Sequence, residues 1–145
     1  TSGKFLINDK IEKQDITEIK TENYTNILKA VHDNPDSYIG MKINFTGYIY
    51  RVIDFKEEQF VIARDMFINE SKTQAVVVGF LCESKDVKNF KDGTWVNITG
   101  NIEMGKYHNE QIPFIKITEI EETNQPEDSC VMPPSNEYVP TSGIF

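Results

Sequence analysis

Apolar and polar positions alternate along Lys42–Ile53, which is the clearest strand pattern in the chain. Ile43, Phe45, Gly47 and Ile49 fall on one face, and polar or tyrosine residues fall on the other. This period of two predicts a β-strand with one buried face. A short polar turn follows, so the next apolar run is expected to return beside this strand as an antiparallel hairpin.

Further apolar runs predict more strands, and the last two are joined by a loop at 105–110. Two shorter runs near the N-terminus, at 5–7 and 16–19, are also candidates for strands. The four longer runs are Gln59–Ile68, Ala75–Cys82, Thr94–Met104 and Gln111–Ile120.

A single amphipathic helix is predicted over Glu22–Asp33, where apolar side chains recur at a spacing of 3.6 residues. Thr21 or Asn23 is suited to cap its start, and Pro35 ends it because the residue before a proline avoids the α region. One or two further helical turns are expected over Ser84–Phe90, between the third and fourth long strands.

This order of elements predicts a mainly β domain, a five-stranded OB-fold-like Greek-key barrel with an N-terminal helix and a short helix between strands 3 and 4. Gly47 supports this fold because such barrels bend sharply within their first strand. A flatter β-sandwich with an added helix is the alternative. We expect an N-terminal extension at 1–20, the barrel domain at 21–121, and an irregular proline-rich tail at 122–145 that is draped over the surface or mobile.

The chain has 145 residues, a length that fits one domain. Its net charge of −8 argues against sequence-independent nucleic-acid binding, which requires clustered lysines and arginines. No apolar run approaches the roughly 18 residues of a membrane span. The chain begins at Thr1 rather than Met, which is expected of a fragment or a processed form.

Cysteines and histidines are too few and too scattered to predict a metal site, and no cofactor is expected. Cys82 lies in an apolar run typical of a buried free thiol, and a disulfide to Cys130 stays open as an alternative. Neither His32 nor His108 has a second ligand at metal-binding spacing. No nucleophile motif or phosphate-binding loop is present, so we expect no enzyme. The competing hypothesis is a catalytic domain that uses carboxylates from its loops.

Arg51 and Arg64 are the only arginines in the chain. If the first hairpin closes through 54–57, the numbers of paired residues sum to 111, and Arg64 lies opposite Gly47 on the apolar face. A buried arginine needs partners. It either anchors an anionic group at the mouth of the barrel or pairs with an internal acid or backbone carbonyls, and we favour this structural role.

Aromatic residues supply the remaining candidates for ligand or partner binding. Tyr48 and Tyr50 project from the outer face of the first strand, and Tyr107 and His108 lie in the loop before the last strand. OB-folds bind ligands across such strands and loops, and exposed tyrosines also suit protein interfaces. Trp95 is expected to be a half-buried barrel residue. Asn-x-Ser/Thr triplets begin at Asn23, Asn44, Asn69 and Asn97, and we interpret them as accidental.

Four fragments occur in an order and spacing that resemble a known bacterial family. They are NPDSYIGMKINFTGYIYR (34–51), FVIAR (60–64), KDGTWVNITG (91–100) and IPFIKITEI (112–120). Together they resemble the C-terminal soluble domain of two-component membrane-permease-complex subunits, an uncharacterised family. The chain departs from the family after Arg64, where members usually carry a Cys-Cys pair. At most Asp65, Asn69 and Glu70 remain there as oxygen donors for a metal, and three polar loop residues are weak evidence for one.

The resemblance implies a soluble domain of a membrane-anchored protein. It does not determine the side of the membrane, and we favour the extracytoplasmic side. Its expected partner is a permease or another membrane protein, and membrane contact would be made only by segments outside this chain. We therefore expect a non-enzymatic accessory or regulatory domain that acts through protein contacts or a small ligand. The alternative is a free-standing OB-fold module that binds an oligosaccharide, a peptide or a nucleic-acid end.

Overall fold

The computed structural model describes residues 16–53 and 55–133. The predicted helix is present as a 3-10 turn, η1 (Thr21–Asn23), that continues into α2 (Tyr24–Asp33), and η2 (Pro35–Ser37) follows at the proline that ends it. The strands are β1 (Thr17–Glu18), β2 (Lys42–Tyr50), β3 (Gln59–Phe67), β4 (Ala75–Glu83), β5 (Trp95–Tyr107) and β6 (Glu110–Glu122).

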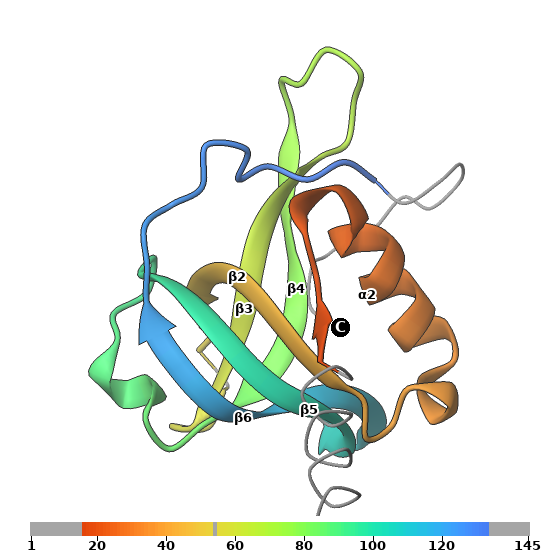
Figure 1. Cartoon of the computed structure of the whole chain (residues 1–145), viewed down its shortest axis with the longest axis vertical. Helices are drawn as coiled ribbons and strands as arrows, with labels where there is room; N and C mark the ends of the chain where they lie inside the picture. The colour runs from red at the N-terminus through yellow and green to blue at the C-terminus, as the bar shows by residue number, and fades with distance from the viewer. Residues whose placement is uncertain (1–15, 54, 134–145) are drawn as a thin grey trace, which may run out of the picture.

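Five of these strands close into the predicted barrel (Figure 1). The sheet order β2-β3-β4-β6-β5 returns to β2, because β5 also pairs with β2. All of these pairs are antiparallel except β4 with β6, which is parallel. This is the five-stranded Greek-key order of an OB-fold, so the predicted fold class is confirmed. The predicted strand at 16–19 is present as β1, which pairs in parallel with the start of β2. The candidate strand at 5–7 lies outside the described residues.

Burial alternates along β2 as its sequence pattern predicts, with Ile43, Phe45, Gly47 and Ile49 all buried. Gly47 lies where β3 comes close to β2. A Cβ atom there would be 2.6 Å from Cγ2 of Ile62 and 2.8 Å from a backbone oxygen of β3. The glycine is required because any side chain would push the two strands apart at the bend.

Between the third and fourth long strands, the one or two turns predicted over 84–90 are present as one 3-10 turn, η3 (Val87–Asn89). The predicted loop before the last strand is wrong. The expected loop at 105–110 is mostly strand, because β5 and β6 continue to a two-residue turn at His108 and Asn109. Both turn residues have positive φ, at 52° and 66°, which matches the right-handed twist of a tight hairpin.

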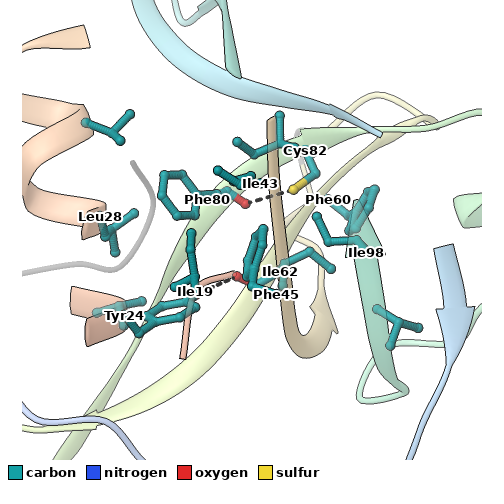
Figure 2. Packing of buried hydrophobic residues seen from close by; sticks show 14 of the residues in the cluster. Ile19, Tyr24, Leu28, Ile43, Phe45, Phe60, Ile62, Phe80, Cys82 and Ile98 are labelled. Atoms are coloured by element: carbon teal, nitrogen blue, oxygen red, sulfur yellow. Dashed lines mark hydrogen bonds between the residues drawn. The ribbon is translucent and has the colours of Figure 1, made fainter. Parts of the chain in front are cut away.

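The helix α2 packs its apolar face against the core of the barrel (Figure 2). Tyr24 and Leu28 point toward the aromatic side chains of the strands in this view. Phe45 and Phe80 meet edge to face with their ring centroids 5.5 Å apart. The Tyr24 hydroxyl donates a hydrogen bond of 2.8 Å to the backbone oxygen of Ile62, so the one polar atom of this buried ring has a partner. Burial raises the pKa of Tyr24 well above its usual range.

The tail is draped over the barrel as far as Pro133, and 134–145 lie outside the described residues. In Figure 1 it runs from the end of β6 across the barrel to the start of α2. Val131 is buried and bridges to Met66 of β3. Its backbone N–H donates to the oxygen of Asp65, at 2.9 Å, and its backbone oxygen accepts from the N–H of Phe67, at 3.1 Å. A proline-rich segment without periodicity is therefore fixed at one point by a β-bridge.

Both cysteines are free thiols. Cys82 is fully buried, as its apolar neighbours predict, and burial raises the pKa of its thiol. Cys130 is partly exposed in the tail. The disulfide that stayed open from the sequence is therefore not formed.

Candidate functional site

The side chain of Arg64 is bonded to three separate segments of the chain. Its Nε donates to the backbone oxygen of Thr46 at 2.8 Å. Its Nη1 donates to Oγ1 of Thr21 at 2.9 Å and to the backbone oxygen of Ser129 at 3.0 Å. Only 3% of the residue is exposed. The side chain thus joins β2, the start of the helix and the tail.

The position of Arg64 follows from the strand register. The pairs Tyr48–Ala63 and Ile49–Ile62 each sum to 111, so the predicted register is confirmed. Toward its start, β2 pairs with β1 instead of β3. Beyond the last residue pair between β2 and β3, Nε of Arg64 donates to the backbone oxygen of Thr46 in β2.

Two aromatic rings lie beside the guanidinium of Arg64. Its central carbon is 5.5 Å from the ring centroid of Trp95 and 5.7 Å from that of Tyr24, both within cation–π range. Burial lowers the pKa of Arg64, and electrostatic attraction from Tyr24 and Asp128 opposes that shift. Among the described residues no carboxylate forms an ion pair with Arg64. Backbone and hydroxyl oxygens are therefore its direct acceptors.

Tyr48 lies next to this cluster. Its ring centroid is 5.4 Å from that of Trp95, which is partly buried as expected, and its hydroxyl donates to Oδ1 of Asp65 at 2.5 Å. Burial, and then the hydrogen bond to Asp65, raise the pKa of Tyr48. Trp95 thus brings Tyr48 and Arg64, two of the predicted site residues, into one cluster.

The other predicted aromatic residues lie elsewhere. Tyr50 ends β2, where it pairs with Val61. Tyr107 is at the far end of β5 from Trp95, and its ring centroid is 5.6 Å from that of Phe55 and 4.2 Å from that of His108. The candidates therefore form two groups at opposite ends of β5 rather than one site.

The other arginine, Arg51, has a structural role, because its guanidinium is bonded to groups of the protein. It forms an ion pair with Asp92, and its Nη2 donates to the backbone oxygens of Val87 and Phe90 at 2.7 and 2.9 Å. These bonds hold the connection that contains η3 against the end of β2.

A polar ladder on the outer wall of the barrel was missed by the sequence interpretation. Two of the Asn-x-Thr triplets lie directly opposite each other, because Asn44 pairs with Thr99 and Thr46 pairs with Asn97 across β2 and β5. The amide of Asn44 donates to Oδ1 of Asn97 at 2.9 Å and to Oγ1 of Thr99 at 3.0 Å. The amide of Asn97 donates to Oγ1 of Thr46 at 2.9 Å. The sequence carried one signal for this ladder, because its four residues occupy outward-facing positions in two predicted strands.

Two hollows flank this ladder, and Asn44 and Asn97 line both of them. The larger is an open groove of about 580 Å³ that also has Asp86, Glu119 and Glu121 in its wall. The smaller, of about 230 Å³, lies beside Arg64. It is lined by Glu18, Ile19, Lys20, Thr21, Glu22, Asn44, Phe45, Thr46, Arg64, Asn97, Pro126 and Asp128.

Neither a metal cluster nor a membrane-spanning helix occurs within 16–53 and 55–133. In these ranges no three His, Cys, Asp or Glu side chains are grouped so that they could hold a metal ion. No helix in the same ranges is long and apolar enough to cross a bilayer.

Comparison with known proteins places the chain in a family. Residues 4–133 match the model of the DUF1980 C-terminal domain. The chain is 25% identical over 116 residues to a "Putative two-component membrane permease complex subunit" of Streptococcus mutans, which covers 79% of this chain and 42% of that protein. It is 23% identical over 130 residues to the UPF0703 protein YcgQ of Bacillus subtilis, which covers 88% of this chain and 45% of that protein.

The chain thus spans less than half the length of these two relatives. Among solved structures, the asparaginyl-tRNA synthetase of Entamoeba histolytica, in complex with asparaginyl-adenylate, overlaps with a TM-score of 0.38 and 12% identity. The overlap covers 78% of this chain and 25% of the synthetase. A score this low supports no inference about function. Because residues 4–133 match the family model, this chain belongs to the DUF1980 C-terminal domain family.

Proposed function

We propose that this chain is an accessory domain of a membrane-permease-complex subunit and acts by binding rather than by catalysis. The observation that carries the proposal is the family match over 4–133, together with a relative that is named as a permease-complex subunit. The chain corresponds to 42% of that relative, so the remaining part of such a protein would supply the anchor.

The geometry of the Arg64 cluster, which comprises Arg64, Tyr24, Tyr48 and Trp95, is consistent with a binding role. Arg64 donates to oxygens of the protein, and Tyr48 donates to Asp65. Side chains that are fixed by such hydrogen bonds stabilise the conformation of a surface. General acid–base catalysis instead needs a group that can exchange a proton with the substrate. The pKa of Tyr48 is shifted upward, away from neutral pH.

Tyr50, at the end of β2, and Tyr107, at the end of β5, are the proposed contact positions for a partner. Tyr50 lies at one end of the first hairpin, and Tyr107 with His108 forms the tip of the β5–β6 hairpin. Tyrosine is enriched at protein interfaces because it combines an apolar ring with a polar tip.

Photo-crosslinking in native membranes tests the proposal. A benzophenone amino acid is placed at Tyr50 or Tyr107 of the tagged native protein that contains this chain. Ile39, which is 44% exposed, provides the matched control position. After irradiation, the tagged protein is purified and its adducts are identified by mass spectrometry.

A multi-spanning membrane protein crosslinked from Tyr50 or Tyr107, but not from Ile39, is the expected result. Recovery of the tagged protein from the aqueous fraction without such an adduct would overturn the proposal. Equal crosslinking from all three positions would overturn the assignment of the contact residues.

A further inference from the structure

The guanidinium of Arg64 has hydrogen-bond donors that the protein leaves unused. An arginine side chain has five N–H donors. One on Nε and two on Nη1 are accounted for by the bonds to Thr46, Thr21 and Ser129. The two on Nη2 donate to no described residue. Donors of a charged group that no protein atom occupies favour an additional acceptor, because a charge-assisted hydrogen bond is stronger than a neutral one.

Arg64 lines the hollow of about 230 Å³. Every buried side-chain nitrogen or oxygen in the described part of the chain has a hydrogen-bond partner, so an unbonded Nη2 must reach accessible space. Arg64 is only 3% exposed, and this hollow is a space that it lines. At about 30 Å³ per water, the volume corresponds to about eight waters or one small organic molecule.

The charges around the hollow are divided between its floor and its rim. Arg64 is buried, whereas Lys20 and three carboxylates of Glu18, Glu22 and Asp128 are exposed. Asp128 is close enough to act electrostatically on Arg64 but forms no ion pair with it, so the two opposite charges stay apart. A simple anion would be attracted by Arg64 at the floor but repelled by the carboxylates of the rim. A simple cation would be attracted by the rim carboxylates but repelled by Arg64.

We propose that this hollow binds a small zwitterion of the α-amino acid class, with its carboxylate on Nη2 of Arg64 and its ammonium group toward the rim acids. Asn44, Asn97 and Thr46 supply neutral amide and hydroxyl groups between the two charged ends. This site lies apart from Tyr107 and His108 and does not depend on the proposed permease partner.

Titration of the full 145-residue chain with glycine and L-alanine, followed by amide chemical shifts in NMR, tests this assignment. We expect saturable shifts confined to 18–22, 44–46, 64 and 126–129. Ethylamine and propionate each carry only one of the two charges. Each is expected to bind at least about tenfold more weakly than alanine, because one charge-assisted hydrogen bond is lost.

Variants separate this site from general charge effects. Asp128→Asn removes a rim charge and is expected to weaken alanine binding several-fold while propionate binding strengthens. Glu110→Gln, in an exposed strand residue at the β5–β6 turn, is the matched control and should leave both titrations unchanged. Arg64→Lys shortens the donor group and should abolish saturation, provided that its NMR spectrum shows a folded barrel.

Two outcomes would overturn the proposal. One is the absence of saturable shifts with any amino acid up to tens of millimolar. The other is equal binding of alanine, ethylamine and propionate, with shifts that Asp128→Asn leaves unchanged. The second result would show that the shifts come from general ionic effects.

Discussion

Gly79 offers a direct test of how closely β3 and β4 approach each other. It lies within β4 and pairs with Ala63. A Cβ atom built on Gly79 would lie 2.1 Å from the backbone oxygen of Ile62 and 2.6 Å from Cγ1 of Val61. A backbone oxygen in a paired strand cannot turn aside, so Gly79→Ala must shift one strand relative to the other.

The expected loss of stability combines two opposing terms. Overpacking a well-packed interior costs about 1–3 kcal/mol, and contact with backbone places Gly79→Ala at the upper end of that range. Replacing glycine also lowers the entropy of the unfolded chain, which stabilises by about 0.4–1 kcal/mol. The net loss is about 2 kcal/mol, which corresponds to a fall of about 4–8 °C in Tm for a chain of roughly this size.

Gly105→Ala is the matched control, because it also places a methyl group in a strand. The nearest atoms to its Cβ belong to the side-chain ring of Phe114, at 2.8 and 3.0 Å, and a side chain can move away. Urea unfolding followed by circular dichroism gives both free energies. Equal stability of the Gly79→Ala and Gly105→Ala proteins would refute the argument from backbone contact.

Further predictions concern buried groups. Tyr24→Phe removes the bond to a core carbonyl and should cost about 1 kcal/mol at pH 7, measured by urea unfolding. Because burial raises the pKa of Tyr24, its contribution to stability is complete below the unfolded value near 10 and is lost above it, by about 1.4 kcal/mol per pH unit. The Phe variant should therefore have a shallower decline between pH 10 and 11, and parallel declines would contradict this. Val131→Ala should destabilise by about 1–3 kcal/mol and speed proteolysis of the tail, whereas Met132→Ala, at a residue that is 50% exposed, should do neither. A maleimide at pH 7.5 should modify Cys130 within minutes and leave Cys82 unmodified until urea unfolds the barrel, and simultaneous labelling, read by mass spectrometry, would contradict this.

The parts of the fold that the sequence predicted are those governed by local periodicity. The alternation in β2 and the length of the first turn were sufficient to place Arg64 on the inner face, because the register of a hairpin follows from its turn. The end of α2 followed from Pro35 by simple steric conflict.

The features that the sequence analysis missed depend on pairing between distant segments. Asn44 meets Thr99 only because β2 closes the barrel against β5, a register that no local pattern specifies. The β-bridge of Val131 to Met66 likewise has no periodic signal in a proline-rich tail. The turn at His108 and Asn109 carried a usable local signal, since both residue types are enriched at positive φ.

The bonds of Arg64 have a consequence for the kinetics of folding. They join residues that are 18, 43 and 65 positions apart in the chain, so none of them forms until distant segments have been brought together. Closing such long loops costs entropy, which places these contacts late on the folding route. Interactions absent from the transition state act on the unfolding rate. Arg64 is therefore expected to slow the opening of the barrel while leaving the rate of its formation almost unchanged.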